Sequence, residues 1–293
     1  MWIFLSILAS ITSAVYYLSI QNVKLNSNVF MVYRGLFPLF FLLPVLLLNP
    51  IIMPASFYIM SFINGLIASY NDNLSFKVNK KYGSAVVSSI TPFSVPLTFI
   101  IWSIIDSKVI DNYINNPVKT LCVVLSFAGI IISVIKYRKV NFIKEAAIKL
   151  VPVIVLSSCL AIFNKTIMNY SGDHSLICAG QYMLISSSVV GFSYLCIYKK
   201  KKLPLKDLIL PNNLLKGLVI AFLVVFVILK NMAMYYTENP AYVSCLLYTT
   251  IIWVLILGRN VSFFKFSKAN QQGATKWKIL FVMSVVLLIM ATK

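Results

Sequence analysis

Two ionisable side chains lie inside apolar segments of the first half of the chain. Arg34 follows the start of the apolar run 30–48, and Asp72 lies in the next run, which begins near Ser56. A charge at the centre of a bilayer costs about 2.5–3.5 kcal/mol on insertion scales, so such residues face protein or water. Arg34 and Asp72 are therefore candidates either for a structural ion pair or for a substrate or gating site.

The second half places two lysine–asparagine pairs inside apolar runs, Asn164–Lys165 and Lys230–Asn231. A lysine stem can carry its ammonium group from such a depth to the membrane interface, and we expect this of Lys165. Lys230 lies deeper and is a candidate for lining a cavity. If Lys230 and Arg34 share one cavity, its positive charge favours a substrate that carries a carboxylate or a phosphate.

Amides recur at helical spacing within the apolar runs. Asn64 and Asn71 are seven residues apart, as are Gln181 and Ser188, and that spacing puts each pair on one face of a helix. Such groups often only bridge neighbouring helices, at about 0.6 kcal/mol each. Their occurrence in several runs also predicts a shared polar cavity.

Tyrosines in the same runs offer stacking surfaces, although aromatic residues in membrane spans more often pack or lie in the interfacial belt. The candidate substrate-binding residues are Arg34, Asn64, Tyr70, Asn71, Asp72, Ser88, Asn164, Gln181, Tyr182, Lys230, Asn231 and Tyr248.

The residue types argue against enzyme chemistry. The chain has seven acidic residues and one histidine, and its five cysteines are scattered without a CxxC pair. We expect no metal site, no catalytic residues and no cofactor. No GxxxxGK[ST] segment is present, which argues against direct use of ATP. A membrane-embedded transferase is thus a weak alternative.

The elements that carry these residues are predicted to be membrane spans. Hydrophobic residues make up 60% of the chain and charged residues 11%, with a mean hydropathy of +0.88. About 20 apolar residues span a bilayer as a helix, and the chain has about ten such runs. The net charge of +19 comes mostly from short loops, so it indicates a lipid surface rather than nucleic acid.

Several finer expectations concern single segments. A stripe of Ser6, Ser10, Ser13 and Tyr17 should face other helices, and Gly129 with Ser133 should allow a close helix approach. We expect a short lysine-bearing turn before Gly83 and a polar loop over residues 106–116.

The two halves of the sequence resemble each other, with a tight turn before the fourth span of each. Five spans in each half require one copy to be inverted. The predicted fold is therefore an all-α polytopic membrane protein with ten transmembrane helices in two inverted five-helix repeats, residues 1–143 and 144–293. Twenty Lys and Arg residues fall on one side and three on the other, which predicts that the rich side is cytoplasmic and that both chain ends are outside. We expect the protein to lie in the plasma or inner membrane.

Four segments resemble the EamA-like branch of the drug/metabolite transporter superfamily. They are KYGSAVVSSITPFSVPLTFIIW, ENPAYVSCLLY, LSFAGIIISV, and VYRGLFPLFFLLP, which holds Arg34. The resemblance implies ten spans, two inverted halves and a central cavity. The chain departs from the family where Arg259 replaces an acidic residue and Thr249-Thr250 replaces a proline, and family members keep both ends in the cytoplasm.

Together these features predict a secondary transporter that moves a small polar or amphipathic metabolite by alternating access, with the bilayer as its surroundings. Asp72 is the candidate for coupling to H⁺ or Na⁺. A flippase for a lipid-linked precursor stays open as the alternative.

Overall fold

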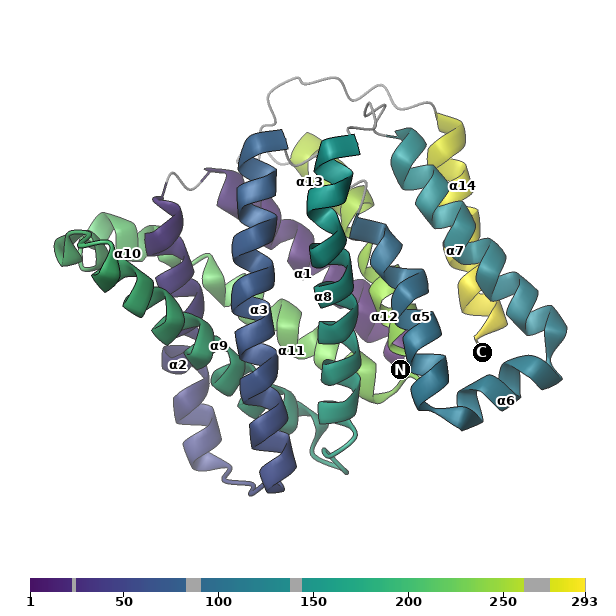
Figure 1. The fold of residues 1–293 in the computed structure, drawn as a ribbon, viewed down its shortest axis with the longest axis horizontal. Coiled ribbons are helices and arrows are strands. Elements are labelled where there is room, and N and C mark those ends of the chain that lie inside the picture. Colours follow the sequence, from purple (N-terminus) through teal and green to yellow (C-terminus); the bar gives the residue numbers. More distant parts are fainter. Residues whose placement is uncertain (23–24, 83–90, 138–143, 261–274, 293) are drawn as a thin grey trace. The chain divides into compact units, whose positions relative to one another are not determined.

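A computed structural model describes residues 1–22, 25–82, 91–137, 144–260 and 275–292, and these residues form helices and short connections without a strand (Figure 1). Long apolar runs favour helices because a helix satisfies its backbone hydrogen bonds internally. The long helices are α1 (Trp2–Asn22), α2 (Ser27–Leu48), α3 (Ala55–Tyr82), α7 (Pro117–Tyr137), α8 (Lys144–Met168), α9 (Ser175–Lys200), α11 (Ile220–Tyr235) and α14 (Thr275–Ala291). The shorter ones are α5 (Ser94–Ile105), α6 (Ser107–Asn115), α10 (Pro211–Gly217), α12 (Pro240–Leu247) and α13 (Thr250–Asn260), with 3₁₀ turns η1 (Thr91–Phe93) and η2 (Leu205–Leu208).

The helices group into two compact units. Unit 1 comprises Met1–Tyr70, Phe163–Tyr236 and Thr249–Phe266, and unit 2 comprises Asn71–Ile162, Thr237–Tyr248 and Ser267–Lys293. Each unit draws on both halves of the sequence, and α3 and α8 contribute to both units. The division into repeats at residues 143 and 144 stays a prediction.

In unit 1, α2 and α9 lie side by side and pack closely where two glycines meet (Figure 1). A Cβ atom added to Gly35 would overlap the backbone of Gly191, and one added to Gly191 would overlap Gly35. Small residues of this kind let two helix backbones approach where apolar lipid gives little drive for association. The α2–α9 pair therefore depends on the absence of side chains at this crossing.

The serine stripe of α1 also lies inside unit 1. Ser6, Ser10 and Ser13 are buried as predicted, whereas Tyr17 is exposed. Thr249 Oγ1 donates a hydrogen bond to Ser10 Oγ at 2.8 Å, and Thr250 Oγ1 donates to the Ser10 carbonyl oxygen at 3.1 Å. These bonds attach the start of α13 to the middle of α1.

Unit 2 contains the pair α7 and α14. A Cβ atom at Gly129 would overlap Ser284 Oγ, so the close approach predicted from Gly129 and Ser133 is confirmed at Gly129.

Helix α12 packs on α5, and its start is set by Asn239, whose Oδ1 accepts from the Ala241 backbone N–H at 2.9 Å. Asn at the N-cap followed by Pro240 is a common helix start.

Two local predictions are wrong. The lysine-bearing segment before Gly83 continues α3 to Tyr82 instead of forming a turn, because no glycine or proline interrupts it. The expected loop 106–116 contains α6, in which Val109 and Tyr113 are buried four residues apart on one face. A helix with only two buried positions is easily overlooked in a polar segment.

Five helices of the described chain are long and apolar enough to cross a membrane, or six if the bent pair α6–α7 counts as one. These segments are Trp2–Ser19, Asn28–Leu48, Ile148–Met168, Ser175–Lys200 and Pro211–Tyr235, with Ser107–Asn115 and Pro117–Ser133 as the bent pair. A set of long apolar helices of this kind is characteristic of an α-helical membrane protein. Shorter apolar helices occupy other predicted spans, and the full number of ten crossings stays a prediction.

Candidate functional site: a buried amide network

The interior of unit 1 contains a hydrogen-bonded network that joins three helices. Asn64 Nδ2 on α3 donates to Asn164 Oδ1 on α8 at 2.6 Å and to the Tyr182 hydroxyl oxygen on α9 at 2.9 Å. All three side chains are buried. We call these residues, Asn64, Asn164 and Tyr182, the amide network. The structure thus brings together three residues that the sequence analysis selected from separate apolar runs.

The local sequence of α3 explains how Asn64 reaches α9. The next residue is Gly65, and a Cβ atom there would lie 2.9 Å from the Ser186 carbonyl oxygen and 2.9 Å from Val189 Cβ. The missing side chain lets the two helices pack closely, so the short Asn64 side chain spans the distance to Tyr182. Ser61, one turn earlier on α3, is also fully buried.

Several buried polar atoms of unit 1 lack a partner among the described residues. They are Oγ of Ser61, Oδ1 of Asn64, Oε1 of Gln181, and both Oδ1 and Nδ2 of Asn231. Gln181 uses its other amide atom, because Nε2 donates to the Ile51 carbonyl oxygen at 2.6 Å. An unpaired buried polar atom costs about 1–3 kcal/mol. Asn231 on α11 is the extreme case, since its side chain is 0% exposed.

Lys165 follows Asn164 and differs from its expected position. The side chain is only 7% exposed, and Nζ donates to the carbonyl oxygen of Tyr235, the last residue of α11, at 3.3 Å. A cation at a helix C-terminus is favourable because unpaired carbonyl groups give that end a negative potential. Lys165 therefore stabilises the end of α11, and Asn231 lies one helical turn before that end.

Unit 2 holds a second group of polar contacts. Asn71 is buried, its Nδ2 lies 3.5 Å from Ser157 Oγ, and its Oδ1 has no partner in the described part of the chain. The Tyr248 hydroxyl lies 3.3 Å from Ser94 Oγ, where α12 ends and α5 begins. Ser158 Oγ donates to the Ser94 carbonyl oxygen at 3.0 Å. These contacts join α3, α5, α8 and α12.

The remaining predicted residues differ in how far they are buried. Arg34 on α2 and Lys230 on α11 are half-buried in unit 1, and Asp72 on α3 is half-buried in unit 2. Tyr70 is 62% exposed, which separates it from the buried amide network. Ser88 lies outside the described residues.

Sequence reasoning overlooked the serines of α8 as candidate site residues. Ser157 precedes Asn164 by seven residues, which repeats the spacing of Asn71 and Asn64 on α3. Residues seven apart share a helix face, so matched spacings on two segments were a usable signal. Lys165 gave no such signal, because its burial depends on where α11 ends.

Among the described residues, no group of three or more His, Cys, Asp or Glu side chains could hold a metal ion. No protein-family model matches this chain, and no curated protein sequence matches it at a significant level. The resemblance to EamA-like transporters therefore rests on the four quoted segments alone.

Proposed function

We propose that this chain is a secondary transporter, and not an enzyme, that moves a small polar or amphipathic metabolite across a cell membrane. The observation that carries the proposal is the set of buried, incompletely paired amides in apolar helices, with Asn231 as its clearest member. Buried amides that serve only as links between helices should be paired, because pairing is what makes such a link favourable. A polar substrate or water passing between the helices would supply the missing partners.

The proposed mechanism is alternating access between two inverted repeats of five spans each. The protein would lie in the plasma or inner membrane as a multi-pass protein with ten crossings.

The charges set the expected substrate class. Lys230 on α11 immediately precedes Asn231, and Arg34 lies on α2, a helix that contacts α11 within unit 1. Two cationic side chains on neighbouring helices favour a substrate with a carboxylate or phosphate group. Asp72 remains the candidate for coupling to H⁺ or Na⁺.

The test is uptake of a panel of labelled metabolites, anionic and neutral, into vesicles that contain the purified full chain. We expect uptake of at least one anionic member, and loss of that uptake in Lys230→Ala and Asn231→Leu. Asn212→Leu, the same chemical change at an exposed position of α10, is the matched control and should transport normally.

The same vesicles should carry a fluorescent lipid probe. If no metabolite moves and the probe exchanges between leaflets, the flippase alternative replaces metabolite transport. If neither moves under an imposed H⁺ or Na⁺ gradient, the transporter proposal fails.

A further inference from the structure

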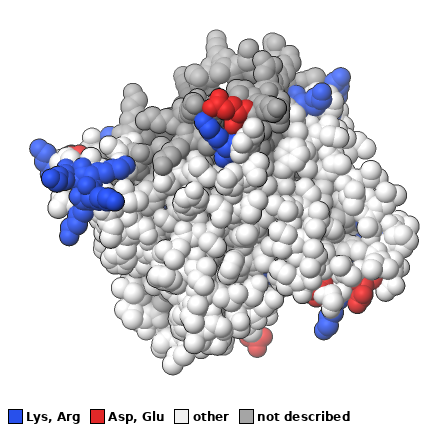
Figure 2. Space-filling model, viewed as in Figure 1, with Lys and Arg blue, Asp and Glu red and all other residues white. Residues whose placement is uncertain are grey.

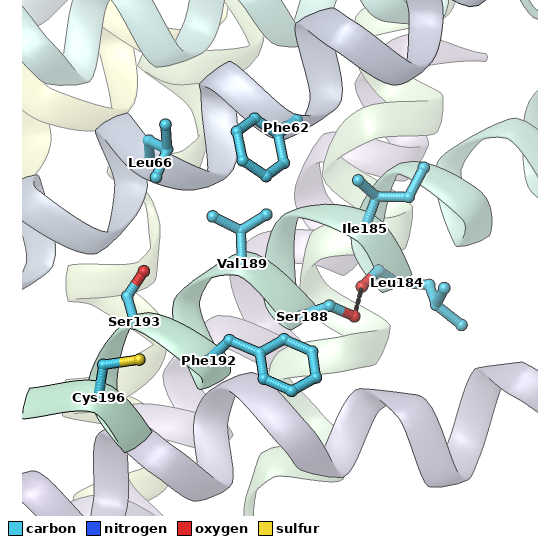
Figure 3. A pocket seen from close by; sticks show the side chains of 9 residues that line it. All are labelled: Phe62, Leu66, Leu184, Ile185, Ser188, Val189, Phe192, Ser193 and Cys196. Atoms are coloured by element: carbon cyan, nitrogen blue, oxygen red, sulfur yellow. Dashed lines mark hydrogen bonds between the residues drawn. The ribbon is translucent and has the colours of Figure 1, made fainter. Parts of the chain in front are cut away.

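An apolar groove runs between α3 and α9 on the surface of unit 1 (Figure 3). Its volume is about 500 Å³, and its walls include Phe62 and Leu66 from α3 and Ile185, Val189 and Phe192 from α9. The Ser188 hydroxyl on the same wall donates to the Leu184 carbonyl oxygen at 2.6 Å, so its polar hydrogen is already used. The groove therefore offers hydrocarbon surface and suits a hydrocarbon chain.

The two helices run in the same direction along the groove. Asn64 bonds to Tyr182, and five residues later the Ser69 carbonyl oxygen accepts from the Tyr194 hydroxyl at 3.4 Å. Cys196 lies at the end of the groove toward the C-terminus of α9, and it is exposed. The exposed Tyr70 of α3 follows Leu66 by four residues and lies toward the same end.

Lysines continue the α9 side of the groove. Phe192, Cys196 and Lys199 are separated by four and three residues, and Lys200 follows Cys196 by four, so these side chains share one face of α9. Lys199 and Lys200 are exposed. Figure 2 shows a dense blue cluster of Lys and Arg at the left of the view, on the side where Figure 1 labels α10, the helix that follows α9 in the chain.

The length of this stripe matches one leaflet of a bilayer. Ile185 and Lys199 are separated by fourteen residues, or about 21 Å at 1.5 Å per residue. Half of a bilayer that includes its headgroup regions measures about 20–22 Å. A lipid with its acyl chain against Ile185 and Phe192 would thus place its phosphate near Lys199.

We propose that the groove between α3 and α9, together with Lys199 and Lys200, binds one anionic phospholipid. The acyl chain packs on Phe62, Leu66 and Phe192, and the two ammonium groups contact the phosphate and the anionic headgroup. The inference requires only that unit 1 lies in a bilayer, and it holds whether or not the chain transports a metabolite.

The experiment measures which lipid contacts the groove. The variant Phe192→Trp places a fluorophore in the groove, and phospholipids with brominated acyl chains quench it on contact. The full chain is reconstituted in phosphatidylcholine vesicles with increasing brominated phosphatidylglycerol or brominated phosphatidylcholine. The signal is the fluorescence that the new tryptophan adds to that of the parent chain. Phe222→Trp, at an exposed position of α11 outside the groove, is the matched control.

We expect brominated phosphatidylglycerol to quench Trp at position 192 at several-fold lower mole fraction than brominated phosphatidylcholine, and equal quenching at position 222. A juxtamembrane lysine changes anionic lipid affinity about fivefold, so Lys199→Gln with Lys200→Gln should abolish the preference. Lys201→Gln with Lys202→Gln, the same charge change just beyond α9, should retain most of it. Equal quenching by the two lipids at position 192, an equal preference at position 222, or equal losses from the two lysine pairs would each overturn the proposal.

Discussion

Replacing Asn231 by leucine separates the two roles that a buried amide can have in this protein. A helix link needs hydrogen-bond partners, whereas a substrate ligand leaves its polar atoms available in the folded chain. Asn231 is fully buried, and neither atom of its amide group has a partner among the described residues. The replacement removes both polar atoms and keeps a branched side chain of similar reach.

The magnitude follows from the two unpaired atoms. Each costs about 1–3 kcal/mol when buried without a partner, so their removal should stabilise the fold by about 2–6 kcal/mol. The added volume of leucine opposes this gain by about 1–3 kcal/mol of overpacking. We therefore expect Asn231→Leu to raise the free energy of unfolding by about 1–3 kcal/mol, whereas uptake of the anionic substrate is lost.

Two native cysteines provide the assay. Cys178 on α9 and Cys245 on α12 are both fully buried, so a thiol-reactive fluorophore labels them only as the protein unfolds. Labelling against temperature in detergent gives an apparent melting temperature for the parent chain and each variant. Asn64→Leu is the comparison, because it removes the hydrogen bonds to Asn164 and Tyr182 and should lower the melting temperature.

Two results would contradict the reasoning. A lower melting temperature for Asn231→Leu would mean that its amide is paired in the folded protein, and the argument from unpaired atoms would fail. A higher melting temperature with unchanged uptake would mean that Asn231 does not contact the substrate.

Three further predictions test other parts of the molecule. Gly191→Ala should lower the melting temperature clearly, because its new Cβ would overlap Gly35. Gly180→Ala on the same helix is the control and should be tolerated, because the nearest atom to its new Cβ lies 3.4 Å away. Equal effects of the two substitutions would refute the close α2–α9 crossing. Thr249→Val should destabilise the protein by about 1 kcal/mol through loss of its bond to Ser10, and a double-mutant cycle with Ser10→Ala should give a coupling energy clearly above zero. Lys201→Cys, with Cys196→Ser to remove the exposed native thiol, should resist an impermeant thiol reagent added to intact cells, and labelling from outside would reverse the orientation predicted from charge.

The sequence predicted the local features better than the contacts between distant segments. The burial of Ser6, Ser10 and Ser13 and the close approach at Gly129 both follow from small residues at helical spacing, a signal contained within one helix. The amide network could be anticipated only as a set of candidates. Asn64 and Tyr182 are separated by 118 residues, and no periodicity within one run shows which amides meet.

Failures of sequence reasoning also have physical causes. The long stem of Lys165 predicts a position at the interface, but the carbonyl group at the end of α11 offers the ammonium a partner inside the protein. The helix over Ser107–Asn115 was hidden because its charged and amide residues resemble those of a loop. Its two buried residues pack against other helices, and the Tyr113 ring lies 5.0 Å from that of Phe99 on α5.

The bend between α6 and α7 predicts where this part of unit 2 meets the membrane surface. The two helices meet at 106°, so when α7 crosses the bilayer, α6 extends along the headgroup layer with Val109 and Tyr113 turned inward. A helix held at the headgroups moves with the membrane surface. In a thinner or thicker bilayer we therefore expect α6 to move with that surface, and α7 and the part of α5 around Phe99 to follow. We therefore expect the depth of this part of unit 2 in the membrane to be set by α6 at the surface rather than by the hydrophobic length of α5, which has only twelve residues.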